Sequence, residues 1–351
     1  MIDPGSTICV TGGCGFIGSN FLHLLAEVHK GRVVILDRLT YAGRLENLDG
    51  LRHEGVFWRG DIANPDDVEE VFQRFCPDYV VNFAAESHVD RSIVGASDFV
   101  LSNVKGVQVL LDACLKHGIK RFLQVGTDEV YGDIPAGAPP ATEESPIKPS
   151  SPYSAAKTAG DLIALSYVRT HDLDVVVTRS SNNYGYRQFP EKLIPLMILN
   201  AIENKPLPVY GDGKQIRDWI YVDDNCRGIW TVLQKGIKGE AYNIGGGNQT
   251  ENIWIVKKIL EILGKPESLI EYVEDRKGHD VRYDIDSSKA ANLGWNRVVN
   301  DVERGLKDTV NWYRENEWWW KPIREKKATT TEELIESFKT EVDPVEMLKK
   351  Y

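Results

Sequence analysis

The strongest constraint on the fold is a glycine-rich segment that joins an apolar run to an apolar-striped helix near the N-terminus. The apolar run, residues 7–10, is predicted to be a strand, and residues 11–18 follow it with glycines at positions 12, 15 and 18. In this pattern Gly12 permits a tight turn, Gly15 lets the backbone approach a pyrophosphate, and Gly18 lets helix and strand pack closely. The amino end of the helix adds N–H donors and positive potential. The segment therefore predicts a dinucleotide site.

A carboxylate about 20 residues further along indicates which dinucleotide is bound. Asp37 ends the second predicted strand, where a carboxylate binds the adenosine ribose hydroxyls and repels a 2′-phosphate. Arg38 follows directly and could accept that phosphate, so the pair favours NAD without excluding NADP. Asp61 and Ile62, at the end of the third predicted strand, occupy a position where an adenine ring is commonly held, although Asp61 could equally cap a helix.

Short apolar runs alternate with longer amphipathic stretches through the first half of the chain, as is typical of a parallel sheet with crossover helices. The predicted strands are residues 7–10, 33–37, 56–61, 79–83, 121–127 and 175–180. We therefore expect an α/β fold, with a Rossmann-like doubly wound parallel sheet over residues 1–181. Residues 182–351, where the alternation fails, are expected to form a smaller C-terminal substrate-binding domain, and the segment around 220–245 could return to the first domain.

Three other segments have distinctive sequences. Residues 132–152 contain six prolines and are expected to form a lid or binding loop rather than a helix. Residues 252–263 carry an apolar stripe that predicts a helix. The run Trp318, Trp319 and Trp320 is expected to pack in the core or in an interface rather than to stack on a sugar.

Composition narrows the class of partner. With 42 Lys and Arg against 52 Asp and Glu, the net charge of the 351-residue chain is −10. An acidic chain without a basic patch is repelled by phosphate backbones and anionic membranes, so neither nucleic acid nor a membrane is expected as a partner. The five cysteines are scattered without a CxxC pair, which favours reduced thiols and argues against a zinc site. Together with the lack of a signal-like or membrane-spanning apolar stretch, this predicts a cytoplasmic protein.

Tyr153 and Lys157 stand four residues apart at the start of a predicted helix. This separation places both on one face about one turn apart, so they can act as a unit. A tyrosine with an ordinary pKa of about 10 must lose about three units to act as a base near neutrality, and the ammonium of Lys157 and a positive nicotinamide ring could supply that shift. Beside a glycine-rich NAD turn, the pair resembles the active site of the short-chain dehydrogenase/reductase superfamily.

Two adjacent carboxylates follow the predicted strand 121–127, at the sheet edge where such folds bind ligands. Asp128 and Glu129 can address one substrate only if the chain leaves strand geometry there, since neighbouring strand residues point to opposite faces. Hydride transfer alone does not require them, whereas an elimination does: one carboxyl protonates a leaving hydroxyl and the other removes a proton next to a ketone. A capping or solvent-facing pair is the alternative.

Seven segments that follow one another along the chain make the resemblance specific. They are residues 36–43, 84–92, 127–132, 151–157, 182–185, 190–195 and 210–219. Together they resemble the dTDP-glucose 4,6-dehydratase family of extended short-chain dehydrogenases/reductases. The resemblance implies tightly held NAD, a nucleoside-diphosphate-glucose substrate, a 4-keto-6-deoxy product and a homodimer.

The resemblance also implies roles for individual residues. Tyr153 with Lys157 would be the base at the 4-hydroxyl, Asp128 the acid, Glu129 the base at carbon 5, and Thr127 a hydrogen-bonding group near carbon 4. The residues implied to bind the cofactor are Gly12, Gly15, Phe16, Ile17, Gly18, Asp37, Arg38, Leu39, Thr40, Asp61, Ile62, Phe83, Ala84, Ala85, Glu86, Ser87, Ser102, Tyr153, Lys157 and Asn183. Those implied to bind the sugar nucleotide are Ser87, Thr127, Asn182, Lys192, Leu193, Pro208, Tyr210, Arg217, Asn252, Arg276 and His279.

Some positions depart from the family pattern, and other functions stay open. Gly126 replaces a hydroxyl residue, Cys14 replaces Ala, and Tyr186 and Lys277 differ in segments expected near the nucleotide base, so thymidine and uridine nucleotides are both possible. No metal site is expected, and His88 is assigned to hydrogen bonding. A sugar-nucleotide 4-epimerase, which needs no acidic pair, and a non-catalytic NAD-responsive binding protein are the alternative functions.

Overall fold

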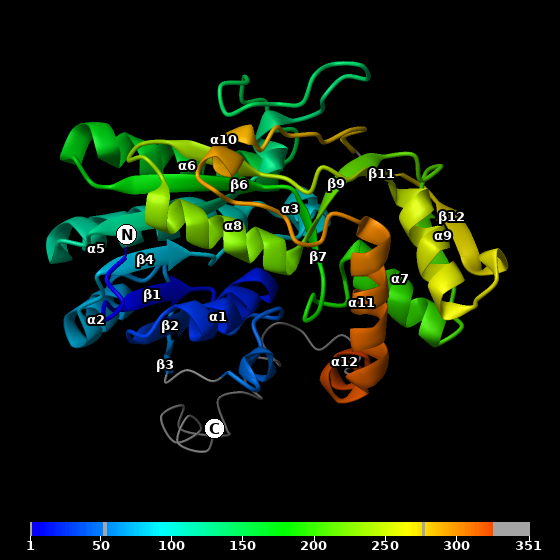
Figure 1. The fold of residues 1–351 in the computed structure, drawn as a ribbon, viewed down its shortest axis with the longest axis horizontal. Coiled ribbons are helices and arrows are strands. Elements are labelled where there is room, and N and C mark those ends of the chain that lie inside the picture. The colour runs from blue at the N-terminus through cyan, green and yellow to red at the C-terminus, as the bar shows by residue number, and fades with distance from the viewer. Residues whose placement is uncertain (1, 52–54, 276–277, 326–351) are drawn as a thin grey trace.

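The centre of the molecule is a seven-stranded sheet in the order β10-β6-β5-β4-β1-β2-β3, in which neighbouring strands run parallel (Figure 1). The computed structural model describes residues 2–51, 55–275 and 278–325. Because the order reverses between β1 and β4, the chain winds outward in both directions, and the predicted doubly wound Rossmann-like fold is confirmed. The strands are β1 (Ile8–Thr11), β2 (Val33–Asp37), β3 (Gly55–Arg59), β4 (Tyr79–Asn82), β5 (Arg121–Thr127), β6 (Val175–Ser180) and β10 (Ala241–Ile244).

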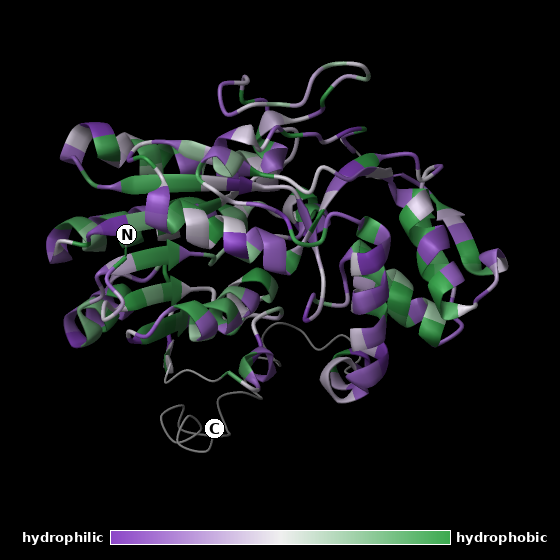
Figure 2. Ribbon diagram, viewed as in Figure 1, coloured by the Kyte–Doolittle hydropathy of each residue, from purple (hydrophilic) through white to green (hydrophobic). Residues whose placement is uncertain are grey.

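Helices cover both faces of this sheet because successive strand residues point to opposite sides. In β1, Ile8 and Val10 belong to the core beneath α1 and α8, while Cys9 belongs to the core beneath α2, α5 and α6. Figure 2 shows the strands as an apolar layer between helices with polar outer surfaces. The covering helices are α1 (Phe16–Val28), α8 (Val222–Lys235), α2 (Pro65–Phe75), α5 (Val107–His117) and α6 (Pro152–His171).

A second core lies beside the carboxyl edge of the sheet and is built almost entirely from residues after 182. Buried apolar side chains of four helices, α7, α9, α11 and α12, meet there. The helices are α7 (Leu193–Ile202), α9 (Asn252–Leu263), α11 (Val302–Glu315) and α12 (Glu317–Glu325). The strands around them are β7 (Asn182–Tyr184), β8 (Leu207–Tyr210), β9 (Ile216–Tyr221), β11 (Gln249–Glu251) and β12 (Ile270–Val273). Helix α8 and strand β10 return to the central sheet, whereas the division at residue 181 stays a prediction.

Short elements make the remaining connections. They are η1 (Leu45–Leu48), α3 (Val89–Val94), α4 (Ser97–Val100), the π-helical turn η2 (Leu101–Gly106), η3 (Asp128–Tyr131), η4 (Glu267–Leu269) and α10 (Ser288–Asn292). Of the proline-rich segment 132–152, residues 132–151 form a loop, as expected, with one isolated bridge at Ala141, whereas Pro152 is the first residue of α6. The carboxylate of Asp133 anchors this loop by accepting hydrogen bonds from the backbone N–H groups of Val281 and Arg282.

The tryptophan run divides between the interior and the surface. Trp319 and Trp320 are buried in the second core, as expected, whereas Trp318 is 52% exposed, so for that residue packing in an interface stays a prediction. The periodicity of a short helix turns only part of a three-residue run inward. Within the described ranges, none of the helices combines the length and the apolar character needed to cross a membrane.

Helix α6 approaches η2 closely because Gly160 has no side chain. A Cβ atom at this position would lie 2.5 Å from the backbone carbonyl oxygen of Asn103. The contact sets how closely α6, which carries Tyr153 and Lys157, packs against η2.

We expect Gly160→Ala to lower the free energy of unfolding by about 1–3 kcal/mol, because overpacking against η2 outweighs the better helix propensity of alanine. Urea denaturation would measure the change. Gly95→Ala is the matched control, since a Cβ at Gly95 meets nothing within 4 Å. Equal stability of the two variants would contradict the close approach of α6 and η2.

Candidate active site

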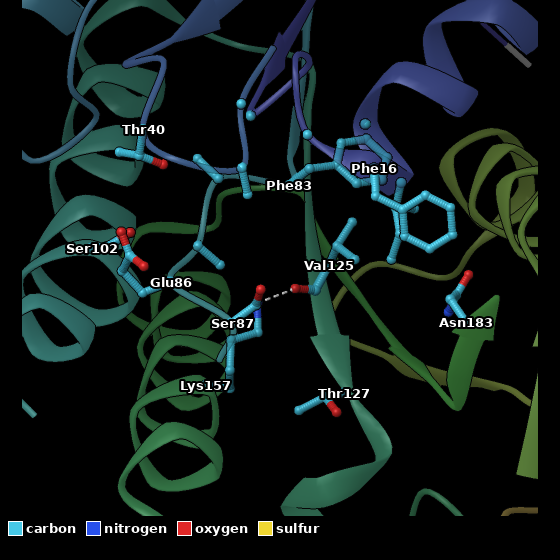
Figure 3. Close-up of a pocket in the computed structure, with 18 of the residues that line it drawn as sticks. Phe16, Thr40, Phe83, Glu86, Ser87, Ser102, Val125, Thr127, Lys157 and Asn183 are labelled. Carbon is cyan, nitrogen blue, oxygen red and sulfur yellow. Dashed lines mark hydrogen bonds between the residues drawn. The ribbon is translucent and has the colours of Figure 1, made fainter. Parts of the chain in front are cut away.

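A cavity of about 310 Å³ opens at the carboxyl edge of the central sheet, where the loops after the parallel strands converge (Figure 3). It brings together most of the predicted site residues, from segments far apart in the sequence. The predicted residues that line it are Gly12, Gly15, Phe16, Ile17, Gly18, Asp37, Arg38, Thr40, Asp61, Ile62, Phe83, Ala84, Ala85, Glu86, Ser87, Ser102, Thr127, Asp128, Glu129, Tyr153, Lys157, Asn182, Asn183 and Lys192.

The glycine-rich turn fits a dinucleotide. Gly12 has a positive φ of 67°, and a Cβ there would lie 2.5 Å from the backbone nitrogen of Ala84. Only glycine therefore keeps the turn in this position, with the amino end of α1 facing the cavity. Asp37 holds the turn from below: its Oδ2 accepts from the N–H of Cys14 at 2.9 Å, and its Oδ1 accepts from the N–H of Leu39 at 2.8 Å. Burial raises the pKa of Asp37, and these two hydrogen bonds partly offset that effect.

The charge around Arg38 disfavours a 2′-phosphate. Its guanidinium donates to Asp61 Oδ2 at 2.8 Å and to Glu86 Oε1 at 3.2 Å, so two carboxylates already neutralise it. Together with Asp37, this arrangement favours NAD over NADP. Asp61 does not cap helix α2, since Asn64 fills that role by accepting from the N–H of Asp66.

Tyr153 and Lys157 lie one turn apart near the start of α6. A capping box between Ser151 and Ser154 fixes the beginning of the helix, and the N–H of Tyr153 donates to Ser92 Oγ at 3.2 Å. The Lys157 ammonium donates to the carbonyl oxygen of Val125 at 2.5 Å, as the dashed line in Figure 3 shows. Burial lowers the pKa of Lys157.

The pKa of Tyr153 is raised above its usual value in the protein alone. Burial is the main cause, the nearby carboxylates of Glu129 and Asp128 add to it, and the hydroxyl of Thr127 acts in the opposite direction. The tyrosine is therefore protonated in this pocket unless a positive charge is added.

Asp128 and Glu129 both face the cavity, as they must if they are to act on one substrate. Strand β5 ends at Thr127 and the helical turn η3 begins at Asp128, so the chain leaves strand geometry there and both Asp128 and Glu129 line the same cavity. Asp128 is 3% exposed, and its Oδ2 has no hydrogen-bond partner in the part of the chain that the structure describes. Burial and then repulsion from Glu129 raise the pKa of Asp128 well above its usual value. Asp128 is thus suited to hold and donate a proton.

Two asparagines on β7 present further unsatisfied groups. The Oδ1 atoms of Asn182 and Asn183 are buried and lack partners among the described residues, and both side chains line the cavity. Buried acceptors of this kind need donors. Hydroxyl or amide groups of a bound ligand would supply them.

Several predicted site residues lie outside the cavity lining, namely the cofactor residue Leu39 and most of the substrate residues. The backbone N–H of Leu39 binds Asp37, and Leu193 begins α7. The other predicted residues outside it are Pro208, Tyr210, Arg217, Asn252 and His279. Arg276 lies outside the described residues, as does Lys277.

Arg217 is one of the predicted substrate residues that lie outside the cavity lining. Its guanidinium is buried, donates to the carbonyl oxygens of Ile216 at 2.8 Å and Asp280 at 2.9 Å, and lies over the ring of Tyr283 at 4.2 Å. Its predicted contact with the sugar nucleotide stays a prediction. Lys192, in contrast, lies at the cavity and donates to the carbonyl oxygen of Ser87 at 2.7 Å.

The structure adds lining residues that the sequence did not single out. Ser180 ends β6, the neighbour of β5, and Ser181 follows it, so their place at the carboxyl edge was available as a signal. Gln188 and Phe189 come from the irregular segment before α7, where no period or spacing marks them, and Glu191 lies in segment 190–195, to which the resemblance assigned other residues. Over the described ranges, no group of three or more His, Cys, Asp or Glu side chains is placed to hold a metal ion.

The roles expected of two histidines can be compared with their contacts. His279 Nδ1 lies 2.6 Å from Asp275 Oδ1, and the ring packs edge-on to Tyr210. His88 Nε2 lies 3.6 Å from Glu191 Oε2, and burial lowers the pKa of His88. Both histidines therefore have carboxylate neighbours.

Comparison with known proteins places the chain among sugar-nucleotide enzymes. It is 48% identical to a probable dTDP-glucose 4,6-dehydratase of Sinorhizobium fredii over 91% of this chain and 96% of that protein. A dTDP-glucose 4,6-dehydratase from Streptomyces venezuelae, solved with NAD and the ligand TYD bound, superimposes with a TM-score of 0.86 at 46% identity, covering 90% of this chain and 99% of that one. The UDP-glucose 4-epimerase of Thermotoga maritima, solved with UDP-glucose, gives a TM-score of 0.82 at 32% identity, covering 88% and 99%.

The model of one family matches residues 8–245, which contain the glycine-rich turn, the acidic pair and the Tyr153–Lys157 pair. The predicted resemblance is thereby confirmed at the level of the family. The chain belongs to the NAD dependent epimerase/dehydratase family.

Proposed function

We propose that this protein is an NAD-dependent dTDP-glucose 4,6-dehydratase. The observation that carries the proposal is the buried carboxyl of Asp128, with an unpartnered oxygen and a raised pKa, beside Glu129 and the Tyr153–Lys157 pair in one cavity. The similarity to dTDP-glucose 4,6-dehydratases over about nine-tenths of the chain supports the substrate. The fit of the glycine turn, Asp37 and the neutralised Arg38 supports NAD.

NAD, when bound, supplies a temporary acceptor for the hydride of carbon 4 and returns it to carbon 6, so the reaction has no net redox change. The residues of the chain supply the proton transfers. Tyr153 takes the proton of the 4-hydroxyl, and Lys157, one helical turn away, contributes positive charge to the base. Because the carboxylates around Tyr153 raise its pKa, the positive charges of Lys157 and of the oxidised cofactor must together outweigh them.

The acidic pair performs the elimination. Once carbon 4 is a ketone, the proton at carbon 5 becomes acidic and Glu129 removes it. Asp128 donates its proton to the leaving 6-hydroxyl, which departs as water. Glu129 then returns a proton, exchanged with solvent, to carbon 5 as carbon 6 receives the hydride, which completes the 4-keto-6-deoxy product. The burial that raises the pKa of Asp128 keeps that proton available near neutrality.

The same observations weigh against the alternatives. A 4-epimerase returns hydride to carbon 4 and needs neither an acid at carbon 6 nor a base at carbon 5. A binding protein without turnover would gain nothing from a costly buried carboxyl. The roles of the remaining predicted substrate residues, Lys192 and Arg217 among them, are proposed on the same similarity.

We also propose a homodimer in the cytoplasm. The five cysteine thiols are all free, which suits a reducing compartment. Val100, Leu101 and Leu162 are exposed apolar side chains on α4, η2 and α6, which contact one another on one side of the sheet. This apolar face would be covered by the same face of a second copy.

In heavy water, dTDP-glucose should give a 4-keto-6-deoxy product that carries one solvent deuterium at carbon 5, because proton removal and return there exchange with solvent. Mass spectrometry and NMR of the product measure this. Glu129→Gln should bind substrate normally but form product at least 100-fold more slowly. A 4-epimerised sugar, or a keto product without the label, would refute the elimination.

Asp128→Asn should be more stable than the wild type at pH 7.5 and no more stable at pH 3. The folded-state pKa of Asp128 is raised, so its contribution to stability is present below the unfolded pKa of about 3.9 and is lost as the pH rises toward the folded value. The neutral amide avoids that loss, which is about 1–3 kcal/mol. Guanidinium denaturation at both pH values measures it, with the exposed Glu144→Gln as a control expected to show no difference. An equal effect of Asp128→Asn at both pH values would contradict the raised pKa.

Leu162→Glu should convert the proposed dimer into a monomer, because it places a charge in the middle of an apolar face. Sedimentation velocity would show the change in mass. Ile237→Glu is the control, since Ile237 is 64% exposed but follows α8 on the opposite side of the sheet. The assignment of this face fails if the wild type is monomeric or if both variants remain dimers.

A further inference from the structure

The buried tryptophan of α12 makes a contact that the proposed chemistry does not explain. The indole N–H of Trp319 donates to Asn47 Oδ1 at 2.7 Å, across 272 positions of sequence. Trp319 belongs to the second core, whereas Asn47 lies in η1, which follows the cavity-lining residue Gly43 along the chain. Both side chains are 1% exposed. The contact therefore joins α12, the last described helix, to the connection between β2 and β3.

Asn47 passes this contact on to the glycine-rich turn. Its Nδ2 donates to the carbonyl oxygen of Cys14 at 2.8 Å, and the backbone N–H of Arg44 donates to the same oxygen at 2.9 Å. The N–H of Cys14 is held by Asp37. The N–H of Gly15, on the other side of the peptide, donates to the carbonyl oxygen of Gly12 at 3.1 Å. The Cys14–Gly15 peptide is thus fixed on both sides.

The orientation of this peptide matters because it immediately precedes α1. The amino end of that helix faces the cavity, where the diphosphate of a dinucleotide would lie. A carbonyl of Cys14 turned toward the cavity would place partial negative charge against the phosphate oxygens. Asn47 and Arg44 hold that oxygen away from the cavity, so the positive end of α1 is left unopposed.

We propose that Asn47 and Trp319 are positioning residues for the cofactor: α12 holds the Asn47 amide, and the amide holds the carbonyl of Cys14 out of the diphosphate site. The proposal rests on the NAD site of the proposed function. It gives the tryptophan run a role, since the second core, which also surrounds the predicted substrate residues, thereby controls how tightly NAD is retained. Retention suits a reaction in which the same cofactor molecule must accept and return one hydride.

Trp319→Phe removes the N–H donor while keeping an aromatic ring in the core. We expect it to weaken NAD binding about 3- to 10-fold, the usual effect of losing one buried hydrogen bond. Trp320→Phe is the matched control: its indole N–H donates to the carbonyl oxygen of Tyr313 at 2.7 Å, inside the second core, and it makes no contact with η1 that the structure records. Both variants should lose similar unfolding temperature without NAD, but only Trp319→Phe should lose part of the further rise that NAD produces.

The measurements are NAD binding to protein stripped of cofactor, by calorimetry, and the NAD retained by the purified full chain after dialysis. Asn47→Ala should weaken NAD binding at least as much as Trp319→Phe, and the double variant should be no worse than Asn47→Ala alone, because Trp319 acts through Asn47. Additive losses, equal losses in Trp319→Phe and Trp320→Phe, or no loss in Asn47→Ala would each overturn the proposal. None of these readouts needs turnover, so a failure of dTDP-glucose dehydration would be seen separately, as NAD binding without product.

Discussion

The burial of one carboxyl group at the end of β5 is the constraint on which the rest of the site depends. Parallel strands deliver their carboxyl ends to one edge, and β5 places Asp128 there at a depth that leaves it 3% exposed. An ionised carboxylate would be costly at that depth, so the group keeps its proton. This burial suits Asp128 to its proposed role as an acid, and the adjacent Glu129, the proposed base, is less buried.

The tight packing around β5 explains why Gly126 departs from the family pattern, in which a hydroxyl residue stands at this position. A Cβ at Gly126 would lie 2.7 Å from the carbonyl oxygen of Thr178 and 2.9 Å from the carboxylate of Asp161. Asp161 is fully buried on α6, paired with Arg179 at 3.3 Å, and its charge acts against the loss of the proton of Lys157. A larger residue in place of Gly126 would therefore have to displace a buried ion pair. The glycine at this position therefore follows from the packing beneath Lys157.

The sequence predicted the strands, the helices and the motif residues of the cavity more fully than the lining residues that come from irregular segments. The glycine turn, Asp37 and the Tyr153–Lys157 pair depend on local spacing, and local spacing is visible in the sequence. Gln188 and Glu191 depend on an irregular segment whose path is set by long-range packing, such as the hydrogen bond from the Tyr313 hydroxyl to the carbonyl of Gln188. No periodicity records such a contact.

The ion pairs of Arg38 with Asp61 and Glu86 also link residues that follow three different strands. They could not be predicted without the strand order of the sheet. The division of the tryptophan run also required the fold to be known, since the short helix α12 places Trp319 and Trp320 in the core and leaves Trp318 exposed.

The electrostatics of the cavity order the steps of the proposed reaction. In the protein alone the pKa values of Tyr153 and Asp128 are both raised, so both groups hold protons and the site contains no tyrosinate. Bound NAD would add positive charge near Tyr153 only in its oxidised form. In the proposed reaction, that charge would help Tyr153 to act as a base at the oxidation step and would leave the expulsion of water to Asp128 and Glu129. One crowded pocket could then hold three proton-transfer groups with separate roles.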